Sequence, residues 1–370
     1  MKITKLNLLN FRNYDKLNLQ LTDNMNIFIG DNAQGKTNII EAIMYLAITK
    51  SYRVINEDDL IKFDKNKAII KGKVVDNDII KNLKIEVEKN NKVLSINDTV
   101  IKKNSNYISN LIVISFNPND LEIIKNSPSI RRNILNIQIS QLSNLYLNTL
   151  NEYNKILKTR NEYLKILFTN SLADKKYFDI ITDKLIEKAI IIYKMRKEYI
   201  DFVNKNISNI YNEICSTNQN LYVNYEPNIE IDHFDDEYIR DKMISIFNNN
   251  YKKELNNGMT LFGPHRDDFS FILDNNNLKF YGSQGQQKVS ILSFKLAEIY
   301  IFNEKLNKKP VLLFDDIFSE LDIKKRNRLL KYVQKDIQTI ITTTDIKNIN
   351  KKSLENAYIF EVRNGNIERK

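Results

Sequence analysis

Hydrophobic and polar residues alternate along several short stretches of the N-terminal third, which is the pattern of half-buried β-strands. We expect strands at 2–8, 16–21 and 25–29, a turn at 10–14, and further short β-like runs near 68–75, 83–88, 92–97 and 111–116. The strand at 25–29 leads directly into Gly30, and apolar residues then recur at helical spacing as far as Ala47. The pattern therefore predicts a mixed α/β segment.

The period becomes helical between about residues 129 and 213. Apolar residues including Leu150, Leu157 and Leu164 share one face of a first stretch, and Ile181, Leu185 and others share one face of a second. Polar residues at 170–174 separate the two stretches. The sequence therefore predicts a short antiparallel helical hairpin.

Mixed structure returns in the last third. We expect a helix at 284–305, a buried strand at 311–314, a helix at 323–335 and a strand at 337–342. The run 311–314 is entirely apolar, which is typical of a strand covered on both faces of its sheet.

A phosphate-binding pattern follows the strand at 25–29. The residues fit G-x-x-x-x-G-K-[ST] and are Gly30, Asp31, Asn32, Ala33, Gln34, Gly35, Lys36 and Thr37. Backbone N–H groups of such a loop face phosphates, the lysine reaches the β- and γ-phosphates, and the threonine hydroxyl binds Mg²⁺. The alternative is a chance match in an ordinary strand-to-helix turn.

Two acidic residues, Asp315 and Asp316, follow the buried strand at 311–314. The carboxyl end of such a strand is where an α/β sheet presents ligands. Asp315 can bind Mg²⁺, directly or through water, and Asp316 can orient and deprotonate the attacking water. The alternative is that both are solvated acids at a strand end.

A second glycine-containing stretch, 281–288 (YGSQGQQK), precedes the helix at 284–305. Ser283, Gly285 and Gln286 would place a hydroxyl and backbone amides at a helix N-terminus, which favours an anion. Because one triphosphate already has its loop at 30–37, we expect this stretch to face the nucleotide of another molecule. The segment 319–322 (SELD) could contribute to the same nucleotide site or provide an N-cap for the helix at 323–335.

Composition narrows the classes further. The net charge of +10 permits a nucleic-acid partner, although abundant lysine alone accounts for a basic chain. A single cysteine, Cys215, excludes an intramolecular disulfide and a Cys-based zinc site. No signal-peptide pattern and no apolar run of membrane-spanning length is found, so we expect a cytoplasmic protein without a membrane partner.

The ordered motifs GDNAQGKT, SQGQQK, VLLFDD and SELD resemble the Walker A, signature, Walker B and D-loop series of the ABC-type ATPases of the SMC group. Within that group the chain resembles the RecF family of bacterial recombination and repair ATPases. The supporting segments are NFRNY at 10–14, the DN-x-x-GKTN form of the phosphate loop, 116–135, GPHRDD at 263–268, and SQGQQK where transporters have LSGGQ.

The resemblance implies an α/β ABC-type ATPase head with mixed β-sheets, assembled from residues 1–118 and 236–370, with a mainly helical lobe inserted at 119–235. It also implies ATP and Mg²⁺ as cofactors, with Lys36, Asp315, Asp316 and Ser283 in catalysis. Ser283, Gly285 and Gln286 would close on ATP held by a partner head, so that ATP binding drives homodimerisation.

Further residues carry roles by resemblance alone. Arg12 and Asn13 resemble residues that touch the nucleotide, with a simple turn as the alternative. Arg131, Arg132 and Arg266 are candidates for contacting DNA phosphates or the partner head, with intramolecular ion pairs as the alternative.

The resemblance has departures. Asp316 stands where most ABC ATPases have Glu, which leads us to expect slow hydrolysis. Thr343, Thr344 and Asp345 stand where a switch histidine is usual, and Asn117 stands where a glutamine is usual.

The resemblance implies DNA as the partner, as single strands or gapped duplex, together with other recombination mediators in recombinase loading, repair, replication and the SOS response. One alternative is another SMC-like ATPase, such as a chromosome-maintenance protein, which would need a longer coil. A transporter ATPase subunit predicts LSGGQ and a switch histidine, and a P-loop kinase leaves SQGQQK and SELD unexplained.

Overall fold

The computed structural model describes residues 1–51, 53–54, 56–170, 172–333, 336–346 and 357–370, and of these the side chains at 319, 320, 331 and 332 are not described. The chain divides into two compact units. The head unit comprises Met1–Leu121, Asn206–Gln219 and Lys288–Lys370, and the helical unit comprises Glu122–Lys205 and Asn220–Gln287.

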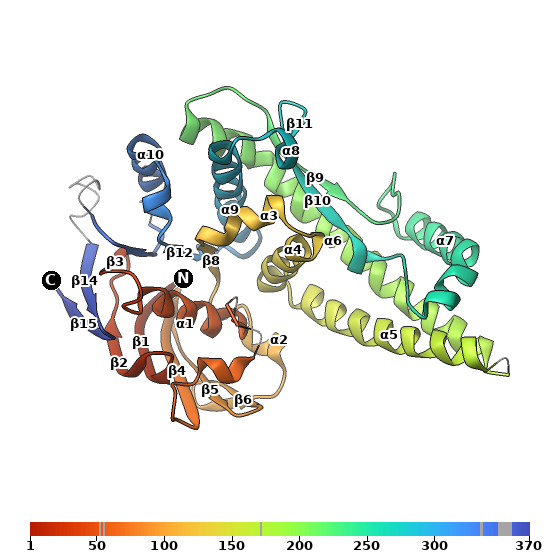
Figure 1. Cartoon of the computed structure of the whole chain (residues 1–370), viewed down its shortest axis with the longest axis horizontal. Coiled ribbons are helices and arrows are strands. Elements are labelled where there is room, and N and C mark those ends of the chain that lie inside the picture. The colour runs from red at the N-terminus through yellow and green to blue at the C-terminus, as the bar shows by residue number, and fades with distance from the viewer. Residues whose placement is uncertain (52, 55, 171, 334–335, 347–356) are drawn as a thin grey trace. The chain divides into compact units, whose positions relative to one another are not determined.

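An antiparallel sheet forms one layer of the head unit, with strand order β2-β1-β4-β5-β6-β7 (Figure 1). Its strands are β1 (Lys2–Phe11), β2 (Tyr14–Gln20), β4 (Lys67–Asp76), β5 (Ile79–Glu88), β6 (Asn91–Ile96) and β7 (Thr99–Ile101). The predicted alternation is seen directly, since Ile3, Leu6 and Leu8 of β1 are buried while polar residues between them are more exposed.

The second sheet of the head unit has the order β15-β14-β3-β13-β12-β8. The pairs from β14 to β8 are parallel, and only β15 runs antiparallel to its neighbour. Its strands are β3 (Met25–Ile29), β8 (Val113–Phe116), β12 (Val311–Asp315), β13 (Thr339–Thr343), β14 (Ala357–Arg363) and β15 (Asn366–Arg369). Every residue of β12 is buried, as its apolar run predicts.

Helices and short turns complete the head unit. They are α1 (Lys36–Ile48), η1 (Glu57–Leu60), α2 (Asn104–Tyr107), η2 (Pro118–Leu121), η4 (Ile317–Glu320), α10 (Ile323–Val333) and all but the first turn of α9 (Gln284–Leu306). Because β3, β12 and β13 are parallel neighbours, their carboxyl ends meet at one sheet edge, where α1 begins.

The helical unit contains the predicted hairpin, formed by α5 (Asn144–Thr169) and α6 (Lys175–Cys215), whose part within this unit ends at Lys205 (Figure 1). Its remaining elements are α3 (Glu122–Lys125), α4 (Pro128–Leu142), β9 (Leu221–Glu226), α7 (Asp236–Asn257), η3 (Pro264–Arg266), β10 (Asp268–Leu273), β11 (Asn276–Asn277) and α8 (Leu278–Tyr281).

Contacts between the two hairpin helices show that they run antiparallel. Arg196 Nε donates to the Tyr146 hydroxyl near the start of α5, and Arg160 Nε donates to Thr182 Oγ1 near its far end. Lys188 and Glu152 form an ion pair between these two points.

The units differ from the ranges expected from sequence. The motif order places residues 236–287 in the head, yet they belong to the helical unit, because β10 pairs along its length with β9. Conversely, the end of α6 from Asn206 joins the head unit, where the backbone carbonyl of Ile214 accepts from Arg328 Nη1. The pattern also misses the break between α4 and α5 at Ser143 and the C-terminal strands β14 and β15.

Candidate nucleotide site

The phosphate loop lies between β3 and α1 and depends on two close approaches that only glycine permits. A Cβ atom at Gly30 would lie 2.3 Å from the Val362 carbonyl oxygen of β14. At Gly35 the backbone has φ +107°, and a Cβ atom would lie 2.5 Å from Asn13 Nδ2. The loop is therefore shaped by β14 on one side and by the β1–β2 turn on the other.

Lys36 lies folded onto this loop. Its Nζ donates to the carbonyl oxygens of Gly30 at 2.6 Å and Asp31 at 2.8 Å. Burial lowers the pKa of the Lys36 ammonium, while the nearby charges of Asp316, Asp315 and Asp31 raise it. A further anionic group, such as a phosphate, would favour the charged form of Lys36 in the same way.

Thr37 and Asp315 meet at the carboxyl end of β12. Thr37 Oγ1 donates to Asp315 Oδ1 at 2.9 Å, and Thr342 Oγ1 donates to the same oxygen at 2.8 Å. Asp315 is only 5% exposed, and burial raises the pKa of its carboxyl group. A hydroxyl and a carboxylate oxygen side by side are hard ligands of the kind Mg²⁺ takes, so these residues fit the expected metal.

Asp316 is held beside this pair by its backbone. It has a left-handed conformation, φ 52°, and its N–H donates to the Thr342 carbonyl oxygen at 3.1 Å. Asp and Asn tolerate this conformation better than most residues with a Cβ atom. Hydrogen bonds to Thr342 of the adjacent strand β13 thus hold both the Asp315 side chain and the Asp316 backbone at the end of β12.

The structure places Arg12 and Asn13 next to the phosphate loop in different roles. Asn13 Nδ2 donates to the Gln34 carbonyl oxygen at 3.3 Å, so this side chain supports the loop from the β1–β2 turn. Arg12 instead makes two hydrogen bonds to the Glu41 carboxylate, from Nε at 2.9 Å and from Nη2 at 2.7 Å. Its guanidinium group is therefore already engaged by an intramolecular ion pair.

Sequence reasoning missed the residue that holds Arg12. Glu41 is fully buried, and it accepts from Arg53 Nη1 at 3.0 Å and from Ser51 Oγ at 2.6 Å as well. The available signal was its position one helical turn after Thr37, because a lone carboxylate in the largely apolar stretch 39–48 of α1 needs cationic partners when buried.

The signature stretch forms a capping box at the start of α9. Ser283 Oγ accepts from the Gln286 backbone N–H at 3.3 Å, and Gln286 Oε1 accepts from the Ser283 backbone N–H at 2.9 Å. Gly285 is exposed, and a Cβ atom there would meet nothing closer than 4.0 Å. Gly285 is therefore not required by packing within this chain.

Two large aromatic side chains adjoin that stretch and were not predicted as site residues. Phe280 is 73% exposed and Tyr281 is 76% exposed, and their rings meet edge to face. They follow Leu278, which is buried and whose carbonyl oxygen accepts from Gln287 Nε2 at 2.7 Å. The turn is thus anchored by Gln287 while its aromatic side chains face solvent.

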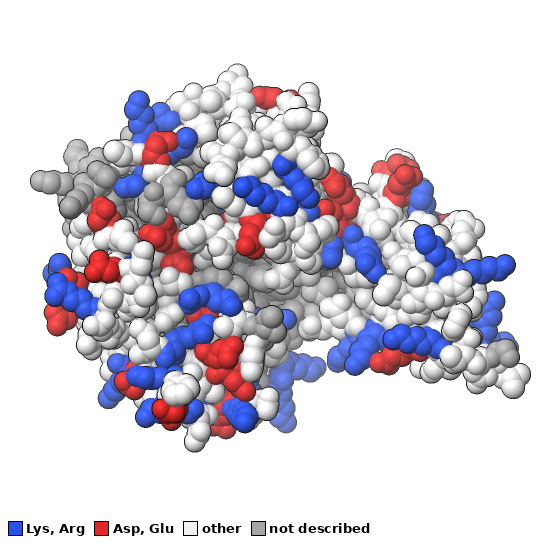
Figure 2. Space-filling view, in the orientation of Figure 1, with Lys and Arg blue, Asp and Glu red and all other residues white. Residues whose placement is uncertain are grey.

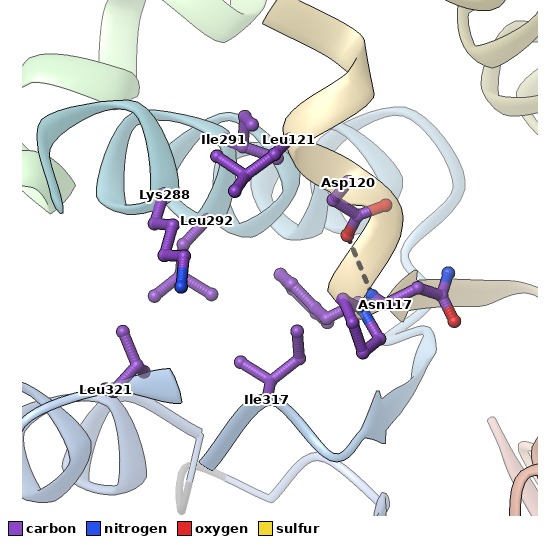
Figure 3. Close-up of a pocket in the computed structure, with 10 residues that line it drawn as sticks. Asn117, Asp120, Leu121, Lys288, Ile291, Leu292, Ile317 and Leu321 are labelled. Carbon is purple, nitrogen blue, oxygen red and sulfur yellow. Dashed lines mark hydrogen bonds between the residues drawn. The ribbon is translucent and has the colours of Figure 1, made fainter. Parts of the chain in front are cut away.

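A small pocket in the head unit is lined by residues that follow β8, by the start of α9 and by the segment after β12 (Figure 3). Asn117 lies at its rim, where its backbone N–H donates to Asp120 Oδ2 at 2.8 Å. The Asn117 amide donates to Ser115 Oγ at 3.3 Å rather than into the pocket.

The structure describes only some side chains of the SELD segment, together with the residues at the position of the switch histidine. Asp322 Oδ1 accepts from the Lys325 backbone N–H at 2.9 Å, which is the N-cap role that the sequence offers for the SELD segment, whereas the side chains of Ser319 and Glu320 lie outside the described residues. Thr343 Oγ1 donates to the Asp345 carbonyl oxygen at 3.0 Å, and Thr344 is exposed.

Comparisons with known proteins show the family of the chain. The RecF/RecN/SMC N-terminal domain family matches residues 2–368. The chain is 38% identical to the DNA replication and repair protein RecF of Halalkalibacterium halodurans and 39% identical to that of Clostridium perfringens, each over 100% of both chains.

Solved structures give the same result. A structure of the recombination mediator protein RecF with ATP in the RecFOR pathway matches with a TM-score of 0.92 and 30% identity, covering 100% of this chain and 97% of the other. An SMC head bound to the C-terminal winged-helix domain of ScpA matches with a TM-score of 0.57 and 14% identity, which indicates a shared fold alone.

The fold and the phosphate loop thus define an ATPase head of the ABC type, as the motif order predicts. Within that class, the chain belongs to the RecF family. In the part of the chain that the structure describes, no helix has the length and apolar character needed to cross a membrane.

Proposed function

We propose that this chain is a DNA replication and repair ATPase that binds ATP with Mg²⁺, dimerises head to head on DNA and hydrolyses ATP slowly. The observation that carries the proposal is the meeting of Lys36, Thr37 and Asp315 at one sheet edge. Relatives named DNA replication and repair protein RecF, matched over their full length, support it.

The residues of the site divide the work of ATP hydrolysis. The Gly30–Thr37 loop holds the phosphates through backbone N–H groups, and Lys36 balances their charge. Mg²⁺, held by Thr37 and Asp315, would neutralise charge developing on the phosphate oxygens. Asp316 orients and deprotonates the attacking water, and its side chain is one methylene shorter than the usual glutamate, which favours slow turnover.

Dimerisation follows from the signature stretch. Gly285 is exposed at the N-terminus of a long helix whose first turn contains no acidic residue. Such an end favours an anion, and the chain's own phosphate loop already has a lysine and a helix N-terminus. We infer that Ser283 and Gln286 act on the ATP bound by a second copy.

DNA is the proposed partner because the solved relatives are described as recombination mediators of the RecFOR pathway. We propose that the DNA is single-stranded or a gapped duplex, that other mediator proteins take part, and that the chain acts in the SOS response. DNA as the partner places the proposed function in the cytoplasm. A DNA-stimulated ATPase rate is its kinetic consequence.

Sedimentation with ATP, ADP or no nucleotide, with and without gapped duplex DNA, tests the proposal. We expect an ATP-dependent dimer in the wild type, and its loss in both Lys36→Arg and Ser283→Arg. If both variants dimerise like the wild type, the two-sided ATP site is wrong. If DNA changes neither the ATPase rate nor the ATP affinity, the DNA role is wrong.

A further inference from the structure

Both carboxylates of the GPHRDD segment at 263–268 form ion pairs with arginines of the same chain. Asp267 is 1% exposed, and its Oδ2 accepts from Arg196 Nη1 at 2.7 Å and from the Tyr225 hydroxyl at 2.5 Å. Asp268 receives two hydrogen bonds from Arg131, at 2.5 and 2.8 Å. Each aspartate therefore neutralises one buried arginine, which makes Arg131 an intramolecular partner and not a ligand contact.

Two further arginines in the same region have no carboxylate partner among the described residues. Arg132, the neighbour of Arg131 on α4, donates from Nη1 to the Asp267 backbone carbonyl at 2.8 Å. Arg266 donates from Nη2 to the Met259 sulfur at 3.6 Å, which is a weak acceptor. Burial lowers the pKa of Arg132. The charges of Arg196 and Arg266 lower it as well, while those of Asp268 and Asp267 raise it, so Arg132 lies among charges of both signs.

A groove of about 250 Å³ within the helical unit is lined by Arg132. Arg266 does not line it but follows His265, which does. Arg132, Asn133 and Ser129 line it from the first two turns of α4, and Asn154 and Tyr153 line it from α5. The first turn of α4 contains no acidic residue, so its dipole adds to the positive potential.

His265, which also lines the groove, adds no charge at neutral pH. Its Nδ1 accepts from the Tyr153 hydroxyl at 2.6 Å and its Nε2 donates to the Thr260 carbonyl at 3.2 Å, which fits the neutral ring. Burial lowers the pKa of His265 to about 4. The positive charge of the groove therefore comes from arginine alone.

We propose that this groove, together with the adjacent Arg266, is a subsite for the DNA backbone. Arg132 and Arg266 contact phosphodiester oxygens there, while Asn133 and Asn154 supply amide donors. Guanidinium groups and side-chain amides are what proteins use on phosphates, and such contacts carry no sequence preference. Over the face shown in Figure 2, basic and acidic side chains are interspersed, so net charge alone does not mark this site.

The inference rests on the proposed DNA role. The salt dependence of DNA binding by the variants tests the subsite separately from that role. Removing one side chain that binds a phosphate should reduce the slope of log K against log salt by about 0.9 on duplex DNA. We would measure binding of the full-length protein to a fluorescent gapped duplex by anisotropy, between about 50 and 200 mM salt, for Arg132→Gln, Arg266→Gln and the double variant. We expect about 3- to 10-fold weaker binding at low salt and a flatter slope for each, with larger effects in the double variant.

Lys158→Gln is the matched control, because the Lys158 side chain is 80% exposed on α5 and is not among the residues that line the groove. Arg266→Gln removes only a weak contact to sulfur, so it keeps the test valid if Arg132→Gln folds poorly. A slope unchanged in both Arg132→Gln and Arg266→Gln, with a salt-dependent wild type, overturns the subsite alone.

Two other results would also decide the matter. A wild type that does not bind DNA overturns both the proposed function and the subsite. Weaker ATP binding in the two arginine variants, with unchanged DNA binding, would assign the subsite to a free nucleotide and overturn the DNA backbone as its ligand.

Discussion

The hydroxyl of Thr37 donates to the carboxylate of Asp315 at 2.9 Å, although the two residues lie 278 positions apart in the sequence. This contact joins the first helix of the head unit to a strand near the other end of the chain. Neither half of the chain contains a complete site. Parallel pairing of β3, β13 and β12 is what brings the two ends together.

Asp315→Asn tests that meeting point. The substitution keeps the size of the side chain but removes the negative charge that would hold Mg²⁺. We expect the ATPase rate to fall by about 100-fold or more, because a bound metal contributes several kcal/mol to such reactions. Phosphate release measures the rate, and ATP binding in a chelator should match the wild type. A variant with wild-type Mg²⁺-dependent turnover would remove Asp315 from the metal site.

Ser283→Asp separates the capping role of Ser283 from its proposed role on a second copy. Asp is as good an N-cap as Ser, so the helix and the thermal stability should change little. The added negative charge would face the partner's triphosphate, and we expect ATP-dependent dimerisation to be lost in sedimentation experiments. Ser283→Asn, which caps without charge, is the control and should dimerise better. Equal dimerisation of the wild type and Ser283→Asp would show that the residue only caps α9.

The sequence predicts the local parts of the site well. Strand β3, the phosphate loop and the strand before Asp315 each have a strong pattern of their own, and the structure confirms these elements. Contacts that depend on how distant segments meet were not predictable from such patterns. Thr342, for example, lies in the buried strand TIITT, and only its pairing with β12 shows that its hydroxyl donates to Asp315 at 2.8 Å.

The same limit explains why residues 236–287 are expected in the head. Motif order along the chain suggests one continuous C-terminal part, whereas the pairing of β10 with β9 places GPHRDD in the helical unit. Two adjacent arginines show that the partner of a single side chain cannot be predicted from sequence position either. Arg131 and Arg132 are equivalent in the sequence, yet only Arg131 forms an ion pair with Asp268 among the described residues.

Asp267→Asn should destabilise the helical unit strongly. It leaves the guanidinium of Arg196, 1% exposed, without its carboxylate partner, and breaking one side of a buried pair costs about 3–5 kcal/mol. Urea unfolding followed by circular dichroism measures the loss of stability. Asp232→Asn is the control, because Asp232 accepts from the Tyr238 hydroxyl in an exposed contact. A change below about 1 kcal/mol in Asp267→Asn would mean that solvent reaches Arg196 when Asp267 is replaced.

His265 should make the stability of the folded chain depend on pH in the acid range. Burial lowers the pKa of the folded-state ring from 6.5 to about 4, so the unfolded chain takes up the proton first as the pH falls. The contribution of His265 is therefore complete above pH 6.5, is lost between pH 6.5 and 4, and levels off below. Linkage gives at most about 3 kcal/mol over this window.

Because carboxylates titrate in the same window, the measurement is a difference between two proteins. We would compare the free energy of unfolding of the wild type and His265→Gln between neutral pH and the folded-state pKa of about 4. The gap between the two curves should narrow as the pH falls, since Gln cannot take up a proton and the advantage of the neutral histidine disappears. His233→Gln is the control, because it replaces the other histidine at an exposed position. Parallel curves for the wild type and His265→Gln would show that the folded chain accepts a proton at His265 as readily as the unfolded chain does.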